Sequence, residues 1–248
     1  MKTAATDMLD IEFPIFAFSH CRDVVAAVSK AGGLGVLGAV AHSPEQLEID
    51  LNWIEDEIGD RPYGVDLIVP AKYAGDEGGG YSLDDIRALI PDTHRAFIDD
   101  ILRRYDVPPL PADDETRTGT AMSAHGGNAP FSANSAGPQL EISLAHRTAF
   151  VANALGPPPQ FLIDRVKEEG RLVGALAGRP QHAERHQAAG VDLIIAQGSE
   201  AGGHTGEIGT MVLIPEIVDA VDIPVLGAGG IGRGRQMAAA MALGAQGV

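Results

Sequence analysis

The sequence predicts an α/β protein of the (β/α)8 TIM-barrel class, on the strength of two observations. First, the chain contains a series of short segments that are almost wholly apolar, without the polar alternation of a half-exposed strand. Second, helical patterns separate most of these segments. Apolar runs separated by helices are typical of parallel strands covered on both faces. An open doubly wound sheet is the alternative arrangement of the same units.

The beginning of the chain is expected to hold three strands and two helices. The strands are the apolar runs 13–18, 33–40 and 63–69. The helices are residues 23–31 and 43–59. Gly32 follows the first helix as a typical stop. The second helix begins at Ser43, a good N-cap, with Pro44 at the first helical position.

The regular alternation stops in the middle of the chain, between residues 71 and 148. One helix is predicted there, over residues 92–105. Residues 108–145 are rich in Pro, Ser, Thr, Gly, Asn and acidic side chains. Such a composition cannot bury enough apolar area to offset the chain entropy. We therefore expect 108–145 to be an insertion between strands 3 and 4 that is disordered or forms a lid, with a role or without one.

The remaining units begin at residue 149. Apolar runs predict strands over residues 149–155, 171–177, 191–196 and 223–226. Helices are expected over residues 159–169, 180–189 and 234–243. Residues 245–248 have the pattern of the first residues of an eighth strand. We therefore expect one barrel domain over residues 1–248 that is truncated in its eighth unit. The preferred interpretation is that the sequence is a fragment of a longer protein.

The bulk properties exclude several classes of function. A net charge of −16 and a pI near 4.7, without a basic stripe, argue against a nucleic-acid partner. No apolar stretch approaches the roughly 18 residues of a membrane span, and the start of the chain has no signal-peptide pattern. The single cysteine, Cys21, fits a reducing compartment. We expect a cytoplasmic protein without membrane or nucleic-acid partners; its oligomeric state stays open.

The polar turn at residues 197–206 is the predicted reactive site. It follows a buried-type run and presents an amide, a carboxylate and an imidazole, from Gln197, Glu200 and His204. Histidine has an unperturbed pKa near neutrality and can donate or accept a proton. His204 is therefore the candidate catalytic residue, although a histidine that only orients the loop is the alternative. Glu200 could orient His204 or cap the next segment, and the sequence does not decide.

A second glycine-rich turn, residues 227–232, has the pattern of a phosphate-binding loop. It follows an apolar strand and opens a helix, whose exposed N–H groups can hold a phosphate. No acidic residue follows to bind a ribose, and the loop after strand seven is a usual phosphate site in barrels. The turn therefore favours a flavin phosphate over NAD.

His182 and His186 have metal-ligand spacing but no third ligand, so a solvated helix face is the preferred interpretation.

Residues 197–206 and 224–231 resemble the nitronate monooxygenase family, formerly called 2-nitropropane dioxygenases. Residues 13–15, 33–38 and 62–67 are similar to the first three strands of that family, in the same order. The resemblance implies a TIM barrel that holds FMN and no metal, and that oxidises alkyl nitronates or nitroalkanes with O₂. The histidine motif is also similar in enoyl-acyl-carrier-protein reductases and quinone reductases. An NAD(P)H-dependent flavin reductase of these types and a non-catalytic flavin-binding barrel therefore remain alternatives.

The resemblance also implies roles for individual residues. His204 would be the base that takes the α-proton of a nitroalkane. The cofactor would be bound by Ala17, Phe18, Asp66, Gln197, Gly202, Gly203, Gly229 and Gly230. Asp66 stands where the family usually has asparagine. A carboxylate there cannot donate a hydrogen bond to the flavin unless it is protonated.

Overall fold

A computed structural model describes residues 2–69, 88–108 and 133–248 of the chain. Within them, one sheet contains seven parallel strands in the order of the sequence. The strands are β1 (Phe16–Ser19), β2 (Leu34–Gly38), β3 (Gly64–Leu67), β4 (Phe150–Asn153), β5 (Leu172–Ala177), β6 (Leu193–Gln197) and β7 (Val225–Ala228). A doubly wound sheet reverses its strand order at one point, whereas a barrel keeps its strands in the order of the sequence. The observed order is therefore that of a barrel.

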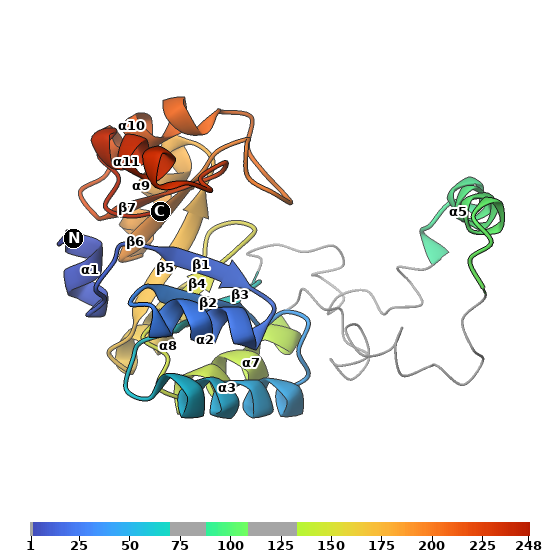
Figure 1. Cartoon of the computed structure of the whole chain (residues 1–248), viewed down its shortest axis with the longest axis horizontal. Helices are drawn as coiled ribbons and strands as arrows, with labels where there is room; N and C mark the ends of the chain where they lie inside the picture. The colour runs from blue at the N-terminus through green and yellow to red at the C-terminus, as the bar shows by residue number, and fades with distance from the viewer. Residues whose placement is uncertain (1, 70–87, 109–132) are drawn as a thin grey trace.

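The sheet curls, and the last residues of the chain lie between its first and last strands (Figure 1). Gly247 forms a parallel bridge with Leu226 of β7, and its carbonyl accepts a hydrogen bond from the Gly227 nitrogen at 2.9 Å. On the other side, the Phe16 nitrogen of β1 donates to the Val248 carbonyl at 2.7 Å. These residues occupy the position of an eighth strand, so the expected barrel arrangement is confirmed.

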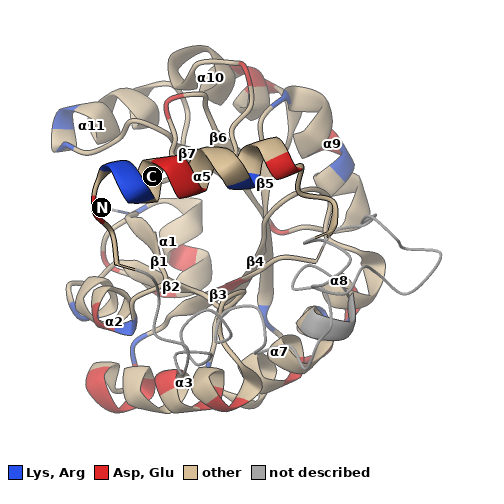
Figure 2. Cartoon of the chain, turned by 90° about the vertical axis from the view of Figure 1, so that its right-hand side faces the viewer, with Lys and Arg blue, Asp and Glu red and all other residues tan. Residues whose placement is uncertain are grey.

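Helices surround the sheet on its outer side (Figure 2). They are α2 (Arg22–Lys30), α3 (Pro44–Ile58), α7 (Ala133–Ala145), α8 (Gln160–Glu168), α9 (Pro180–Ala189), α10 (Thr210–Ala220) and α11 (Gly234–Ala242). As predicted, the Ser43 hydroxyl caps α3 by accepting from the Gln46 nitrogen at 3.1 Å. Helix α5 (Asp92–Arg104) buries none of its residues. Among the described residues, no helix is long and apolar enough to cross a membrane.

The hydrophobic core has two parts, one outside and one inside the sheet. The larger part joins the strands to the outer helices. The smaller part fills the inside of the barrel, where residues in and after α1 (Ala4–Leu9) pack against strand residues such as Phe150 and Leu193. Thr3, the N-cap of α1, also donates from its hydroxyl to the Gln246 carbonyl at 2.7 Å. Helix α1 therefore closes the amino end of the barrel, and space remains at the carboxyl end.

The expected disordered insertion is wrong for residues 133–145, which form helix α7. Leu140 and Leu144 are buried in the core, and α7 packs against α3. The Gln139 side chain also donates to the carbonyls of Ala39 and His42 at 2.8 and 3.0 Å. The apolar residues recur every four positions and bury area that the overall composition conceals. Residues 109–132 lie outside the described part, so a lid there stays a prediction.

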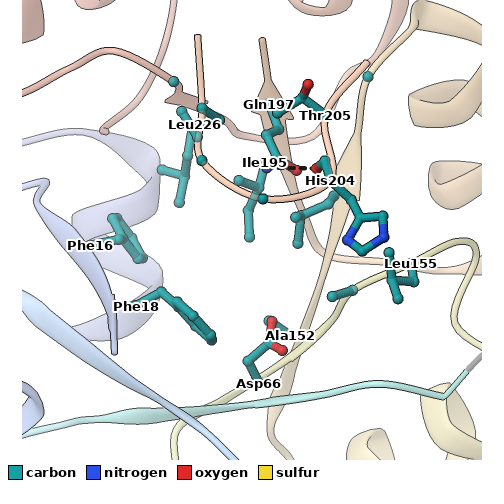
Figure 3. Close-up of a pocket in the computed structure, with 18 of the residues that line it drawn as sticks. Phe16, Phe18, Asp66, Ala152, Leu155, Ile195, Gln197, His204, Thr205 and Leu226 are labelled. Atoms are coloured by element: carbon teal, nitrogen blue, oxygen red, sulfur yellow. Dashed lines mark hydrogen bonds between the residues drawn. The ribbon is translucent and has the colours of Figure 1, made fainter. Parts of the chain in front are cut away.

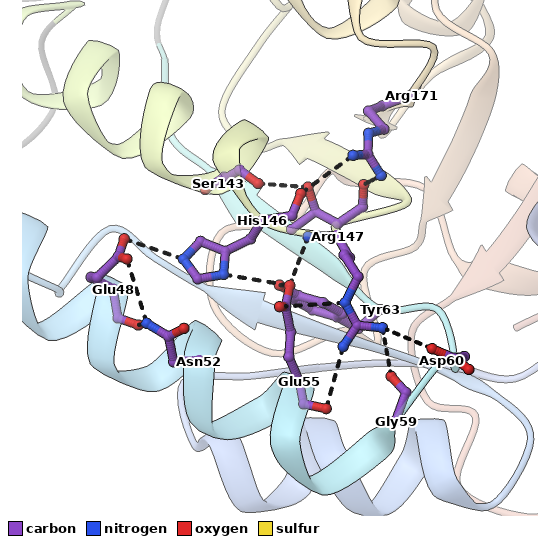
Figure 4. A network of polar contacts seen from close by, with 11 residues as sticks. Glu48, Asn52, Glu55, Gly59, Asp60, Tyr63, Ser143, His146, Arg147 and Arg171 are labelled. Carbon is purple, nitrogen blue, oxygen red and sulfur yellow. Dashed lines mark hydrogen bonds and ion pairs between the residues drawn. The ribbon is translucent and has the colours of Figure 1, made fainter.

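A polar network holds α3 and α7 together near the amino ends of β3 and β4 (Figure 4). His146 lies between two carboxylates of α3, 3.2 Å from Glu48 and 3.4 Å from Glu55. Glu55 also accepts from the hydroxyl of buried Tyr63 at 3.0 Å and from the Arg147 backbone nitrogen at 2.6 Å. The network lies away from the carboxyl ends of the strands, on the side of a barrel that contributes to stability rather than to catalysis.

Candidate functional site

A cavity of about 980 Å³ opens at the carboxyl ends of the strands (Figure 3). In a barrel of parallel strands, the loops after the strands converge at this end. The side chains and turns that matter for chemistry come from six strands or the segments after them: Phe16, Phe18, His20, Asp66, Leu155, Arg179, His182, Gln197, Gly202, Gly203, His204 and Gly229. The volume is that of a ligand pocket, which ranges from about 300 to 1,000 Å³.

Most residues selected from the sequence meet at this one cavity. Those that line it are Phe18, Asp66, Gln197, Gly202, Gly203, His204 and Gly229. Ala17 does not line it, because neighbouring residues of a strand point to opposite faces, and Phe16 and Phe18 take the inner face of β1. Gly230 belongs to the same turn as Gly229 without lining the cavity. Their roles toward a cofactor stay predictions.

The loop after β6 brings Gln197 and His204 together. The Gln197 amide donates to the His204 carbonyl at 3.2 Å, and the imidazole of His204 is directed into the cavity (Figure 3). Gly203 has φ +73°, and a side chain there would be strained whatever the surrounding space. The backbone conformation of Gly203 and the amide of Gln197 therefore set the position of the histidine.

The turn after β7 is held from two sides. Gly229 has φ +112°, and a Cβ atom at this position would lie 2.7 Å from the Thr210 hydroxyl. On the other side, the Gln236 amide of α11 donates to the Gly230 carbonyl at 2.7 Å and accepts from the Gly232 nitrogen at 3.0 Å. The fixed turn lies directly before α11, and a helix N-terminus is a place where a phosphate can bind; the phosphate role of this turn stays a prediction.

Asp66, on β3, is the buried acidic group of the cavity. It is only 8% exposed, and its carboxyl group is directed into the cavity (Figure 3). No described residue donates a hydrogen bond to this carboxyl group. Burial raises the pKa of Asp66 to about 7, because the charged form loses its hydration. Near neutral pH, therefore, Asp66 can lose or gain a proton and can donate a hydrogen bond when protonated.

The turn after β4 stores backbone strain beside the cavity. Leu155 has φ +61°, which is unfavourable for a residue with a side chain, and that side chain lines the cavity near His204 (Figure 3). Fully buried Asn153 holds the turn in place. Its side-chain oxygen accepts from the Val69 nitrogen at 2.9 Å, and its amide donates to the Gly156 carbonyl at 3.2 Å. Asn153 belongs to no sequence motif by which it could be recognised.

The two histidines of α9 have different surroundings, and the prediction of a solvated face is wrong for His186. That residue is 2% exposed, and its Nε2 atom lies 3.1 Å from the Leu176 carbonyl. Burial lowers its pKa. His182, missed as a site residue, lines the cavity, and its pKa is lowered by burial and by nearby Arg185. The described residues contain no cluster of His, Cys, Asp or Glu that could hold a metal ion.

Comparisons with known proteins agree with this geometry. A family model described as nitronate monooxygenase matches residues 2–94 and 110–248. The chain is 57% identical over 249 residues to the protein named "Putative monooxygenase Rv1533" of Mycobacterium tuberculosis, covering all of this chain and 64% of that protein. It is 32% identical over 266 residues to the "Probable nitronate monooxygenase" of Staphylococcus saprophyticus, covering all of this chain and 66% of that protein.

A solved structure shows the same likeness. The nitroalkane oxidase of Streptomyces ansochromogenes matches this chain with a TM-score of 0.75 and 28% sequence identity. The match covers 99% of this chain and 66% of that structure's chain. The sequence thus spans just under two thirds of the length of these relatives.

Proposed function

Since this chain belongs to the nitronate monooxygenase family, whose members are flavoenzymes, we propose that it is an FMN-dependent oxidoreductase that oxidises alkyl nitronates and nitroalkanes with O₂. The observation that carries the proposal is the meeting of His204 with the two glycine turns around Gly203 and Gly229 at one cavity. This chain covers only 64% and 66% of the two relatives, so the substrates and partners named here are proposed and not inferred from those relatives. The proposed partners are a small nitro compound and O₂.

Three features of the cavity support the proposal that it binds FMN. Phe18 exposes 56% of its surface and lines the cavity, where it would offer an aromatic contact to a flat isoalloxazine ring. Gln197 can both donate to and accept from the polar edge of the ring. The fixed turn at Gly229 and Gly230 would hold the phosphate. When bound, FMN supplies the electron acceptor and the reaction with O₂.

The side chains of the chain itself would manage the substrate and its proton. His204 would take the α-proton of a neutral nitroalkane, for which an imidazole has a suitable pKa range. A preformed nitronate has already lost that proton and does not need this step. Phe16 and Leu155 line the same cavity and would limit the access of water to the reacting carbon.

The first experiment is an absorption spectrum of the purified protein with and without added FMN, followed by O₂ consumption with propyl-1-nitronate. We expect a bound-flavin spectrum and uptake of O₂ that depends on the nitronate. Rapid bleaching of the flavin by NADH under anaerobic conditions would instead support an NAD(P)H-dependent flavin reductase. A protein that binds FMN and consumes no O₂ with nitronate or nitroalkane would support a non-catalytic flavin-binding barrel.

A further inference from the structure

Asp66 is a buried acid that no described residue satisfies. It lies on β3, 8% exposed, with its carboxyl group directed into the cavity (Figure 3). The other titratable or charged side chains that line the cavity are His20, Arg179, His182, His204 and Glu207. None of them forms a hydrogen bond or ion pair with Asp66 among the described contacts, and Arg179 is paired with Glu207 at 2.8 Å. A buried polar group normally has a partner, so the missing partner of Asp66 points to a ligand.

The charge of that ligand can be inferred from the surroundings. Apolar side chains such as Phe16, Ala152 and Leu155 line the same cavity, so an ionised carboxylate is poorly solvated there. Burial accordingly favours the neutral acid, which is a hydrogen-bond donor. A neutral acid suits an anionic oxygen, whereas an ionised carboxylate beside the same oxygen would repel it strongly in a weakly polar cavity.

We propose that Asp66 recognises an anionic ligand by donating a hydrogen bond from its neutral carboxylic acid, so that binding of the anion is coupled to uptake of one proton by Asp66. The proposal rests on the proposed function, because the alkyl nitronate is the anion in question. The proton comes from the solvent, and no covalent bond of the ligand changes. Asp66 is thus a specificity-determining residue that selects the nitronate anion.

The test uses butanoate, a carboxylate with the planar anionic head of an alkyl nitronate and no reacting carbon. Its affinity for the FMN-loaded protein is measured from pH 6 to 9 by the change in flavin absorption and by calorimetry in buffers of different ionisation enthalpy. For wild type, we expect affinity to fall about tenfold per pH unit above the pKa of Asp66, with uptake of one proton on binding at alkaline pH.

Two substitutions separate hydrogen bonding from simple charge repulsion. Asp66→Asn carries a permanent donor of the same shape, so it should bind butanoate at every pH, without the alkaline loss and without proton uptake. Asp66→Leu has neither charge nor donor, so it should bind weakly throughout. Urea unfolding checks that both variants fold. Because Asp66 is also a predicted cofactor-binding residue, the variants are compared with wild type at equal flavin content, measured from the flavin absorption band. Tight binding by Asp66→Leu would show that only the charge matters and would overturn the proposed hydrogen bond.

The imidazole of His204 could also attract an anion when protonated. One control tests whether His204, and not Asp66, causes the pH dependence of butanoate binding. His204→Gln should keep the pH dependence and the proton uptake if Asp66 is responsible. The same pH dependence in Asp66→Asn as in wild type, or no butanoate binding by any variant, would overturn the proposal. Normal butanoate binding without nitronate oxidation would refute the proposed function alone. If the protein takes up no FMN, the titration is made by calorimetry on the FMN-free protein.

Discussion

The carboxylate of Glu200 accepts two hydrogen bonds from Thr210, one from the backbone nitrogen at 2.8 Å and one from the hydroxyl at 2.9 Å. These bonds lower the pKa of Glu200 and cap the beginning of α10, which has no side-chain cap at its own N-cap residue, Gly209. The Thr210 hydroxyl also lies 3.0 Å from the Gly229 carbonyl. Glu200 therefore caps the helix, and through Thr210 it connects the loop of His204 with the turn at Gly229.

Replacing Glu200 by alanine should loosen both loops together. We expect Glu200→Ala to lower the unfolding temperature and to weaken FMN binding, because α10 loses its cap and the turn at Gly229 loses support. The lowered pKa means that this stabilisation is present above the ordinary carboxyl pKa and is lost as the pH falls through the folded-state pKa. The difference from wild type should therefore shrink at acid pH. Glu216→Ala, which removes an exposed carboxylate from the same helix, is the matched control and should retain FMN affinity.

Gly229→Ala tests whether the turn after β7 needs its backbone conformation. The φ of +112° and the approach of a Cβ atom to the Thr210 hydroxyl should together cost about 1–3 kcal/mol of folding free energy. FMN affinity should fall as well, since the phosphate would meet a displaced backbone. Gly232→Ala, where nothing lies within 4 Å of a Cβ atom, should change urea unfolding little. Equal effects of the two substitutions would show that the turn is not specially constrained.

The strand order and the place of the reactive turn could be predicted from the sequence for a physical reason. Buried parallel strands must be continuously apolar, and the polar residues that follow them must lie at one end of a barrel. For that reason the turns that contain Gln197, His204 and Gly229 could be placed at one end of the sheet from the amino-acid pattern, whereas the roles of these residues toward a flavin came from the family resemblance. Their meeting at a single cavity depends on strand order, and the order is sequential.

What the sequence did not reveal depends on which face of an element turns inward. Ala17 and Phe18 were both expected against the flavin, but adjacent strand residues face opposite ways, and the register that selects Phe18 is set by pairing with β2. His186 is buried because α9 rotates that face toward β5, a consequence of tertiary packing. Helix α7 was not predicted because its sequence contains Pro138 and several polar residues, and its apolar residues are few.

Tyr63→Phe removes one donor from the polar network at the amino end of the barrel (Figure 4). The buried hydroxyl donates to the Glu55 carboxylate at 3.0 Å, and burial raises the pKa of Tyr63 further above its ordinary value. Loss of a hydrogen bond to a charged acceptor should lower the free energy of unfolding by about 1.5–3 kcal/mol in urea titrations. Tyr105→Phe, on an exposed residue beside α5, should stay within about 0.5 kcal/mol of wild type. FMN binding should be unchanged in both variants.

The burial of His186 leads us to expect that the stability of the protein depends on pH in a specific way. Its Nε2–H donates to the Leu176 carbonyl and its Nδ1 atom is buried without a partner, which fits a neutral ring. Since the folded-state pKa is lowered, the unfolded chain binds a proton more readily, and stability is lost as the pH falls below the unfolded pKa of about 6.5. Urea unfolding of His186→Gln between pH 7.5 and 5.5 should therefore depend less on pH than wild type. Exposed His94→Gln should follow wild type, and a parallel course for all three would exclude His186 as the cause.

His204→Asn separates proton removal from the later oxidation. Asparagine keeps a polar side chain in the loop but cannot accept the α-proton as a base, so turnover of neutral nitropropane should fall about 10²–10⁴-fold. Propyl-1-nitronate needs no such step and should be oxidised at a rate close to that of wild type. FMN affinity should also be retained, because the Gln197 amide bonds to the backbone carbonyl of residue 204 and not to its imidazole. The measurement is O₂ consumption with each substrate, made on wild type and variant at equal flavin content. Equal losses on both substrates would assign His204 to positioning of the substrate, and no loss on either would remove it from the reaction.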